Sequence, residues 1–342
     1  MKRFAVMALL LMIALVASCE RAPKREIYRK SGEAMYTNIT ITVVSDDAAK
    51  AERAIDSAFD EITRMEKLLS FWTEDSEIAA INRMAGKAPV KISPETLEII
   101  TWANRISSDT EGAFDATIGP VIKQWDFKKH LKPDPLKLAK SLKRVDYRMM
   151  ALNSADSTAY LADASMSFDT GGIAKGFGAD KAVDALKRAG IDAGLVAIAG
   201  DIRAFGRKPD GSAWTVGIRD PRGESQDTLM ATIELTDAAI STSGDYERFF
   251  MDGDKRLHHL LDPRTGYPAE GAISASVVAP LAVQTDGYST GAFILGPALG
   301  LEAIDKAGLD CVIIDDQGVA HMTPPMKNML HWVDGSQYAP KQ

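Results

Sequence analysis

The chain has 342 residues, 46% of them hydrophobic and 25% charged, two cysteines and a net charge of −7. These values are ordinary for a globular protein whose core fills one large domain or two. The acidic balance, without a long basic block, gives no support to nucleic-acid binding.

The N-terminal stretch has the pattern of an export signal. Two basic residues precede an apolar run, residues 4–17, that is too short for a comfortable membrane span. The run ends in Leu-Val-Ala-Ser-Cys, which resembles the lipobox of bacterial lipoproteins, a class in which Cys19 would be acylated. We therefore expect a signal peptide (1–18), a flexible tether (19–33) and a lipid anchor on the exported, periplasmic side of a bacterial envelope. A plain secretory signal is the alternative.

The remaining chain predicts helices and strands in mixed order. Apolar residues at helical spacing, with capping residues before them, predict helices at 48–69, 77–84, 93–107, 173–189, 282–294 and 298–307. Alternating or continuous apolar runs between turn residues predict strands at 34–44, 147–152, 158–161, 194–199, 202–205, 214–218, 229–235, 238–242, 246–251, 274–279 and 310–314. This irregular order favours an α+β fold over a doubly wound sheet. Cys311, in an apolar run, is expected in the core.

Aromatic side chains mark two stretches between helices. Trp72 lies in a polar turn, where it could stack on a planar ligand, although half-buried packing is the interpretation that periodicity favours. Residues 112–127 have the glycines and proline of a loop but too many apolar side chains for a solvated one. Long apolar loops tend to wall binding sites. Residues 128–144 are polar and predict a surface excursion.

The stretch 167–184, SFDTGGIAKGFGADKAVD, combines an acid, four glycines and a lysine at the start of a predicted helix. Paired glycines let backbone approach a ligand, and the amides that open a helix favour an anion. With Lys175 just inside, phosphate is the natural guest. The alternative is a glycine-rich turn that only connects a strand to a helix.

Two later motifs carry candidate chemistry. His258 and His259 end a predicted strand ahead of a tight Asp-Pro-x-Thr-Gly turn, where a neutral imidazole could accept a proton from a hydroxyl. A histidine simply bonded to the turn is the alternative. Asp286 and Thr290 lie four apart on a helix, so a carboxylate and a hydroxyl share one face and could hold magnesium. A helix cap with a back-bonded threonine is the alternative.

Taken together, eight stretches resemble, in the same order, motifs of the ApbE family of flavin transferases. They are AMYT, SFWTEDSEIAAIN, GAFDATIGP, DTGGIAKGFGAD, AGD, TSGDYERFF, HHLLDPRTG and TDGYSTGAF. The resemblance spans residues 34–315 and implies one compact, antiparallel-rich, T-fold-like α+β domain over residues 34–335. Phe177 replaces the usual tyrosine, and Ala199 replaces the first glycine of a Gly-Gly-Asp motif.

Members of that family use magnesium to move the FMN half of FAD onto a Ser or Thr of a partner protein, and release AMP. Their acceptors are subunits of membrane redox complexes and related exported flavoproteins. By motif, the resemblance implies an FAD pocket formed by Met35, Trp72, Ala113, Phe114, Asp115, Asp169, Lys175 and Leu260. It implies magnesium ligands at Asp286, Thr290 and the Gly172 carbonyl, and a base at His259.

These roles predict that magnesium and Lys175 neutralise the diphosphate while His259 takes the proton of the acceptor hydroxyl. Two other functions stay open: hydrolysis of FAD to FMN and AMP (an FAD pyrophosphatase), and non-catalytic FAD binding by a periplasmic lipoprotein. Residues 286–292, DGYSTGA, also resemble a flavin acceptor sequence. We interpret this as coincidence, because Thr290 cannot both ligate a metal and carry FMN.

Overall fold

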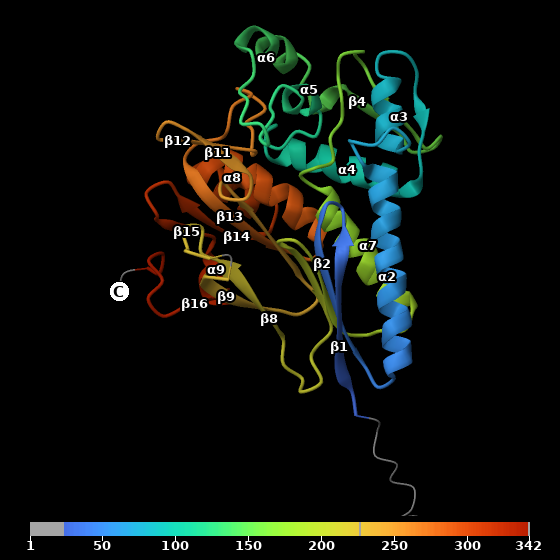
Figure 1. The fold of residues 1–342 in the computed structure, drawn as a ribbon, viewed down its shortest axis with the longest axis vertical. Coiled ribbons are helices and arrows are strands. Elements are labelled where there is room, and N and C mark those ends of the chain that lie inside the picture. The colour runs from blue at the N-terminus through green and yellow to red at the C-terminus, as the bar shows by residue number, and fades with distance from the viewer. Residues whose placement is uncertain (1–23, 226, 341–342) are drawn as a thin grey trace, which may run out of the picture.

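A computed structural model describes residues 24–225 and 227–340 as one elongated molecule (Figure 1). Its centre is a sheet of eight strands in which every neighbouring pair is antiparallel. The strand order is β1 (Glu26–Ala34), β2 (Thr37–Ser45), β6 (Gly194–Ile198), β7 (Asp201–Phe205), β10 (Ala239–Gly244), β13 (Ala272–Ala279), β14 (Asp310–Asp315) and β15 (Ala320–Met322). The predicted α+β class is confirmed.

Smaller sheets surround the central one. The first contains β16 (Leu330–Trp332), β9 (Leu229–Leu235) and β8 (Trp214–Arg219). The second is the hairpin of β11 (Phe249–Asp252) and β12 (Lys255–His258). The third contains β3 (Val90–Lys91), β5 (Thr158–Leu161) and β4 (Met150–Asn153), which follows the 3₁₀ helix η1 (Tyr147–Met149).

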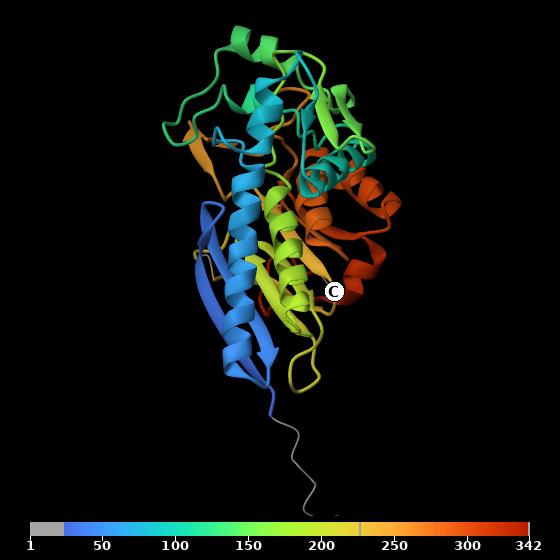
Figure 2. The same cartoon turned by 90° about the vertical axis from the view of Figure 1, so that its right-hand side faces the viewer.

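Two helices, α2 (Ala48–Leu69) and α7 (Ala174–Arg188), lie side by side over the half of the sheet that contains β2 and β6 (Figure 2). Asp47 caps α2 because its side chain accepts hydrogen bonds from the backbone amides of Ala49 and Lys50. The buried side chains of α2 recur every three or four residues, which is the apolar stripe that the sequence predicts. The other helices are α3 (Glu77–Arg83), α4 (Pro94–Asp109), α5 (Gly119–Ile122), α6 (Pro135–Leu142), α8 (Ala282–Lys306) and α9 (Pro324–Met329).

Helix α8 packs on β10, β13 and β14 and crosses α7. It is interrupted at Gly296, whose φ is 71°, just before Pro297, where the sequence predicts the boundary between two helices. The crossing with α7 is close, because a Cβ on Gly176 would lie 2.1 Å from the Ala282 carbonyl oxygen. Only glycine fits at this point, so the crossing brings the start of α7 onto the start of α8.

The structure corrects the expected tether over residues 19–33. Residues 26–34 form β1, which pairs with β2 over nine residue pairs. β1 is an edge strand with an exposed outer face, so its charged sequence gives little apolar signal. Met35 and Tyr36, with φ of 51° and 59°, form a two-residue turn with the backbone signs of type I′. The expected signal peptide and Cys19 lie outside the described residues.

The predicted end of the domain at residue 335 is also too early. Tyr338 is buried in the cluster that contains Trp214, and its hydroxyl donates a hydrogen bond to Asp220. The sequence patterns also do not predict α5, α6, α9, β3, β15 and β16. Each is at most eight residues long, too short for a periodic pattern to stand out.

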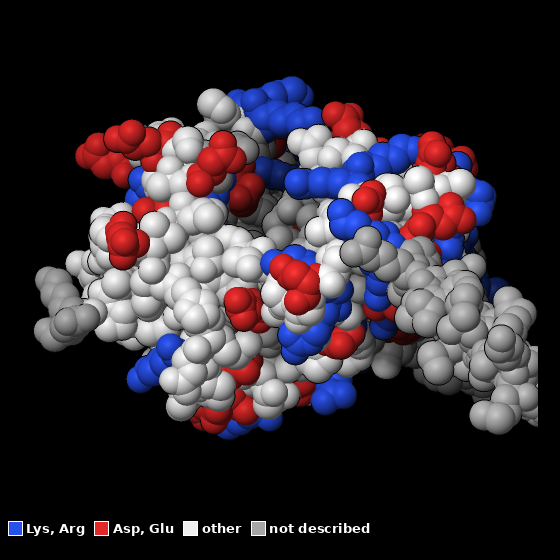
Figure 3. Space-filling view, turned by 90° about the horizontal axis from the view of Figure 1, so that it is seen from below, with Lys and Arg blue, Asp and Glu red and all other residues white. Residues whose placement is uncertain are grey.

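Acidic and basic side chains are interspersed over the end of the molecule where β1 begins (Figure 3). Within residues 24–225 and 227–340, no helix combines the length and apolar character needed to cross a membrane.

Candidate functional site

The predicted wall residues 113–115 and Asp169 come from two loops that pair with each other. The Asp169 amide donates to the Ala116 carbonyl at 2.7 Å, and Ile118 bridges Ser167 in parallel. The glycine turn that follows Asp169 also contacts the apolar loop, because a Cβ on Gly172 would lie 3.2 Å from the Phe114 ring. The structure therefore brings the glycine-rich stretch against the apolar loop.

The Asp115 carboxylate is buried and bonded within its own loops. Oδ1 accepts from the Thr117 amide at 2.7 Å and from the Thr117 hydroxyl, and Oδ2 accepts from the Tyr147 amide at 2.9 Å. Burial raises the pKa of Asp115, and these hydrogen bonds oppose the shift. The side chain therefore holds the loop in shape. Ala113 and Phe114 are also buried, and Phe114 is the apolar side chain that lies beside Gly172.

Asp169 is buried and lies within reach of two positive charges. Its Oδ1 accepts a hydrogen bond from the Gly171 amide at 2.6 Å. Burial raises the pKa of Asp169 to about 6, and the charges of Lys123 and Arg248 oppose the shift. No sequence pattern assigns a role to these two cations, although the motif TSGDYERFF contains Arg248. Sequence spacing alone does not predict that the charges of Lys123 and Arg248 act on Asp169.

Lys175 lies between two carboxylates at the start of α7. Its Nζ pairs with Asp201 on β7 and lies 3.4 Å from Asp286 Oδ1 on α8. Burial lowers the pKa of Lys175, but the two carboxylates outweigh burial and raise it above its ordinary value. The ammonium therefore stays charged. Asp201 belongs to the motif AGD, yet the sequence analysis assigns it no role.

Asp286 faces the same point from α8. Its Oδ2 accepts a hydrogen bond from the Gly176 amide at 2.9 Å, in the first turn of α7. Burial raises the pKa of Asp286 to about 6, the negative charge of Asp201 adds to the rise, and Lys175 opposes it. The N-terminus of α7, which favours an anion, thus lies next to one lysine and two acids in the interior.

The donor set proposed for magnesium lies around this crossing. Thr290 Oγ1 is one turn beyond Asp286, where it is 3.3 Å from the Asp286 carbonyl oxygen and 3.2 Å from Ser243 Oγ. A Cβ on Gly172 would be 3.6 Å from that same Oγ1, so Gly172 and Thr290 face each other. In the described chain the Gly172 carbonyl accepts no hydrogen bond, so its oxygen is free for a ligand.

These donors fit magnesium. A carboxylate, a hydroxyl and a carbonyl are all oxygen ligands, which a hard cation prefers, and magnesium usually takes few protein ligands. Over the residues whose structure is described, no group of three or more His, Cys, Asp or Glu side chains is placed to hold a metal. A site of this kind therefore depends on phosphate and water for the rest of its coordination.

The two histidines have different surroundings. His258 Nε2 lies 3.0 Å from the Ala269 carbonyl oxygen, which is the turn-bonded alternative. The His259 amide donates to the Arg248 carbonyl at 3.0 Å, and its buried Nδ1 has no hydrogen-bond partner within the described residues. Burial lowers the pKa of His259 to about 3, and the charge of Arg248 acts in the same direction. The imidazole is therefore neutral, as a proton acceptor must be. Leu260, next to it, is buried.

Trp72 and Met35 lie at the edges of this region. Trp72 is 68% exposed and its ring meets that of Phe71 edge-on with the centroids 5.0 Å apart, so the half-buried packing favoured by periodicity is wrong. Phe71 touches the apolar loop, because a Cβ on Gly119 would be 3.1 Å from its ring. Met35 Sδ would be 3.2 Å from a Cβ on Gly178, which puts Met35 against α7 one turn past Lys175.

Comparisons with known proteins agree with this arrangement. The model of the ApbE family matches residues 35–313. The chain is 35% identical over 298 residues to the FAD:protein FMN transferase of Treponema pallidum, with 82% of each chain covered. It resembles the crystal structure of the ApbE protein of Thermotoga maritima with a TM-score of 0.82 at 28% identity, covering 89% of this chain and 99% of that one. The structure of the flavin transferase ApbE of Vibrio cholerae matches with a TM-score of 0.78 at 27% identity, and the same shares of the two chains are covered.

Proposed function

The chain belongs to the ApbE family and is a flavin transferase, and from this premise we propose that it moves FMN from FAD to a Ser or Thr hydroxyl of an acceptor protein and releases AMP. FAD is the substrate. The acceptors that the family resemblance implies are flavoprotein subunits of membrane redox complexes.

One observation carries the finer part of this proposal. At the α7–α8 crossing, the Lys175 ammonium lies within 3.4 Å of a buried carboxylate, Asp286, and the Gly172 carbonyl and Thr290 hydroxyl face each other nearby. One cationic side chain and three oxygen donors beside a helix start suit a diphosphate that carries a divalent ion. Magnesium held by Asp286, Thr290 and Gly172 would supply charge neutralisation for the diphosphate oxygens.

The remaining chemistry belongs to the chain's own side chains. The acceptor hydroxyl oxygen attacks the phosphorus of the FMN half, and this new P–O bond forms as the bond to the AMP oxygen breaks. AMP leaves with the electron pair. The hydroxyl proton passes to His259 at Nε2, since Nδ1 is buried. Lys175 binds the diphosphate and holds the leaving phosphate in line.

The test is incubation with FAD, magnesium and an acceptor protein that contains a Ser or Thr flavinylation segment, followed by denaturing electrophoresis and in-gel flavin fluorescence. An acceptor with that residue changed to alanine is the control. We expect covalent fluorescence on the intact acceptor only, with AMP released in equal amount. Free FMN formed without any acceptor would instead support FAD hydrolysis, and FAD that stays intact with the acceptor present would support simple binding.

We further propose that Cys19 anchors the protein by lipid to the exported face of the cell envelope. The Leu-Val-Ala-Ser-Cys sequence supports this. Fractionation of cells that express the full chain tests it: the wild type is expected in the membrane pellet, and Cys19→Ala in the soluble or precursor fraction. Equal membrane association of both would contradict a lipid anchor at this residue.

A further inference from the structure

The two helices that form the site cap each other. Their N-cap residues, Ile173 and Leu281, have apolar side chains that cannot accept a hydrogen bond. Asp286 of α8 accepts from the Gly176 amide of α7 at 2.9 Å. In return, Asp180 of α7 accepts from the first two amides of α8, those of Ala282 and Val283, at 2.9 Å each.

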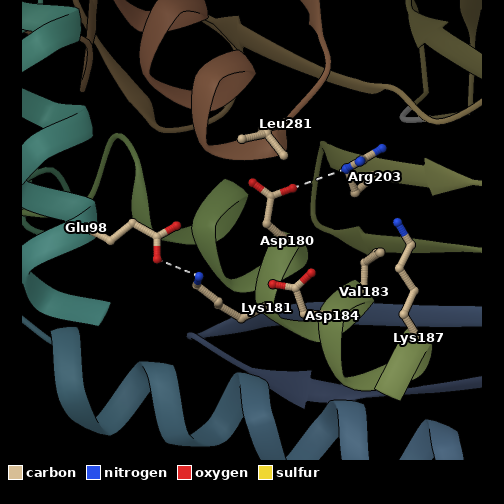
Figure 4. Close-up of a pocket in the computed structure, with 8 residues that line it drawn as sticks. All are labelled: Glu98, Asp180, Lys181, Val183, Asp184, Lys187, Arg203 and Leu281. Carbon is tan, nitrogen blue, oxygen red and sulfur yellow. Dashed lines mark hydrogen bonds and ion pairs between the residues drawn. The ribbon is translucent and has the colours of Figure 1, made fainter. Parts of the chain in front are cut away.

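Asp180 is held in place from a third element. It is buried, and its Oδ1 lies 3.2 Å from Nε of Arg203 on β7. Figure 4 shows Asp180 pointing from α7 towards Arg203 and the start of α8 at Leu281. Arg203 lies two residues after Asp201, the partner of Lys175, so both residues point to one face of β7. Asp180 and Lys175 thus tie α7 to the same strand.

These hydrogen bonds fix the position of the first turn of α8 relative to α7. The Asp180 carboxylate uses both oxygens on α8, so the first turn of that helix cannot slide or rotate without losing a hydrogen bond. Asp286 is the fifth residue of α8 and Thr290 the ninth, on the same face. Their distance from Lys175 and Gly172 therefore depends on the start of α8.

We infer that Asp180 is a positioning residue for the metal and diphosphate site: it sets the distance from Asp286 and Thr290 to Lys175. This inference rests on the proposed function. Asp180 is not a catalytic residue, because it acts through the backbone of α8. Residues that orient metal ligands in this way are typically worth about 10- to 100-fold in metal affinity.

The test uses Asp180→Asn, which keeps the size of the side chain but replaces one acceptor oxygen by an NH₂ group facing a backbone amide. Binding of Mn²⁺, an oxygen-liking stand-in for magnesium, is measured by loss of the free-ion EPR signal, with FAD present and no acceptor. We expect the dissociation constant to rise at least about tenfold. Asp184→Asn, one turn further on α7 at an exposed position, removes the same charge and should leave the constant within about twofold.

A second variant separates positioning from stability. Leu281 has the extended backbone of an N-cap, with φ −121° and ψ 146°, so Leu281→Asp can cap α8 from within its own chain. In the double variant Asp180→Asn, Leu281→Asp, we expect thermal stability to recover while Mn²⁺ affinity stays weakened. Recovery of both, or unchanged affinity in Asp180→Asn, would show that Asp180 only stabilises the helix. If Asp180→Asn does not fold, the double variant decides alone.

The wild type separates this inference from the function beneath it. Wild-type protein that binds Mn²⁺ with FAD but modifies no acceptor would refute the transfer and leave the comparison of Asp180→Asn with Asp184→Asn to judge the inference. Wild-type protein that binds no Mn²⁺ would refute the metal site and the inference together.

Discussion

Two buried carboxylates in this molecule resemble each other in exposure and differ in their surroundings. Asp115, in the apolar loop, accepts three hydrogen bonds from neutral donors of its own and the neighbouring loop. Asp286, at the helix crossing, faces the ammonium of Lys175, a second acid in Asp201 and the Gly176 amide at the start of α7. Burial raises the pKa of both.

The difference separates a carboxylate that shapes the chain from one suited to a ligand. Neutral amides and a hydroxyl satisfy the hydrogen-bonding capacity of Asp115, so its interactions stabilise the folded chain and leave none for a ligand. The charges around Asp286 cannot all be neutralised by each other, because two acids meet one lysine. A divalent cation bound there, as proposed above, would add the missing positive charge. Burial and a raised pKa alone therefore do not identify a functional acid; the charge of its partners does.

The largest effect on transfer is expected from a substitution of Asp286. Asp286→Ala removes the only acid among the proposed magnesium ligands, and charge stabilisation by a metal is worth several kcal/mol in the transition state. We expect metal-dependent transfer to fall by about 10³ or more, measured by in-gel flavin fluorescence over time at fixed FAD. Undiminished transfer in magnesium buffer would rule out the assigned ligands, and Asp115→Ala serves as the matched loss of a buried acid.

The next largest expected effect on transfer is at His259, whose imidazole is neutral because it is buried. His259→Asn removes the proposed proton acceptor, a contribution of about 10²–10⁴ for general bases. We expect transfer to slow by that factor while FAD and Mn²⁺ affinities hold, as judged by flavin fluorescence titration and EPR. The turn-bonded His258→Asn is the control for the site. A larger loss in His258→Asn than in His259→Asn would reverse the assignment of the base.

The same histidine predicts a dependence of stability on pH. The pKa of His259 is lowered from 6.5 to about 3 in the folded chain, so the unfolded chain takes up a proton below pH 6.5 that the folded chain refuses. The wild type should therefore lose stability as pH falls from 6.5, and His259→Asn should lose less, by about 2 kcal/mol at pH 5. Urea unfolding at pH 8 and pH 5 measures the difference. Equal losses in both proteins would place the ring in water.

The opposite half of the comparison is tested at Asp115. Asp115→Ala leaves the Thr117 amide and hydroxyl and the Tyr147 amide without their acceptor. We expect about 1–3 kcal/mol lower stability in urea unfolding, with transfer at saturating FAD and magnesium within a few-fold of wild type. Asp115→Asn should keep part of the stability, since one oxygen remains. A loss of transfer without a loss of stability would make Asp115 a ligand-binding residue after all.

The helix crossing shows how far sequence reasoning reaches. Gly172, Lys175, Asp286 and Thr290 can be singled out because each belongs to a local pattern: a glycine turn before a helix, or two oxygens four residues apart. The structure adds that Asp286 bonds the turn that carries Lys175. No local pattern predicts that contact, because the two segments are separated by more than a hundred residues.

The residues that sequence reasoning missed are those whose meaning depends on such distant contacts. Asp180 reads as an ordinary polar residue of α7 until its partners at the start of α8 are known. Lys123 and Arg248, both distant from Asp169 in the sequence, act on its charge only in the folded chain. The charged residues of β1 predict a tether because they face water, whereas in the structure the backbone of this segment pairs with β2. Register and long-range caps are set by tertiary packing, which periodicity does not record.

The smallest expected effect extends the comparison to a wall residue that carries no charge. Trp72 is 68% exposed, so removal of its ring should hardly change stability. If it stacks on the flavin, Trp72→Ala loses about 0.5–1.5 kcal/mol of aromatic contact, which is about a 2- to 10-fold rise in the dissociation constant for FAD. Trp72→Phe should lose less, because it keeps an aromatic face. Flavin fluorescence titration measures the dissociation constant of each of the three proteins for FAD. Equal affinity in all three would place the isoalloxazine away from this ring, leaving Phe114 as the aromatic wall of the pocket.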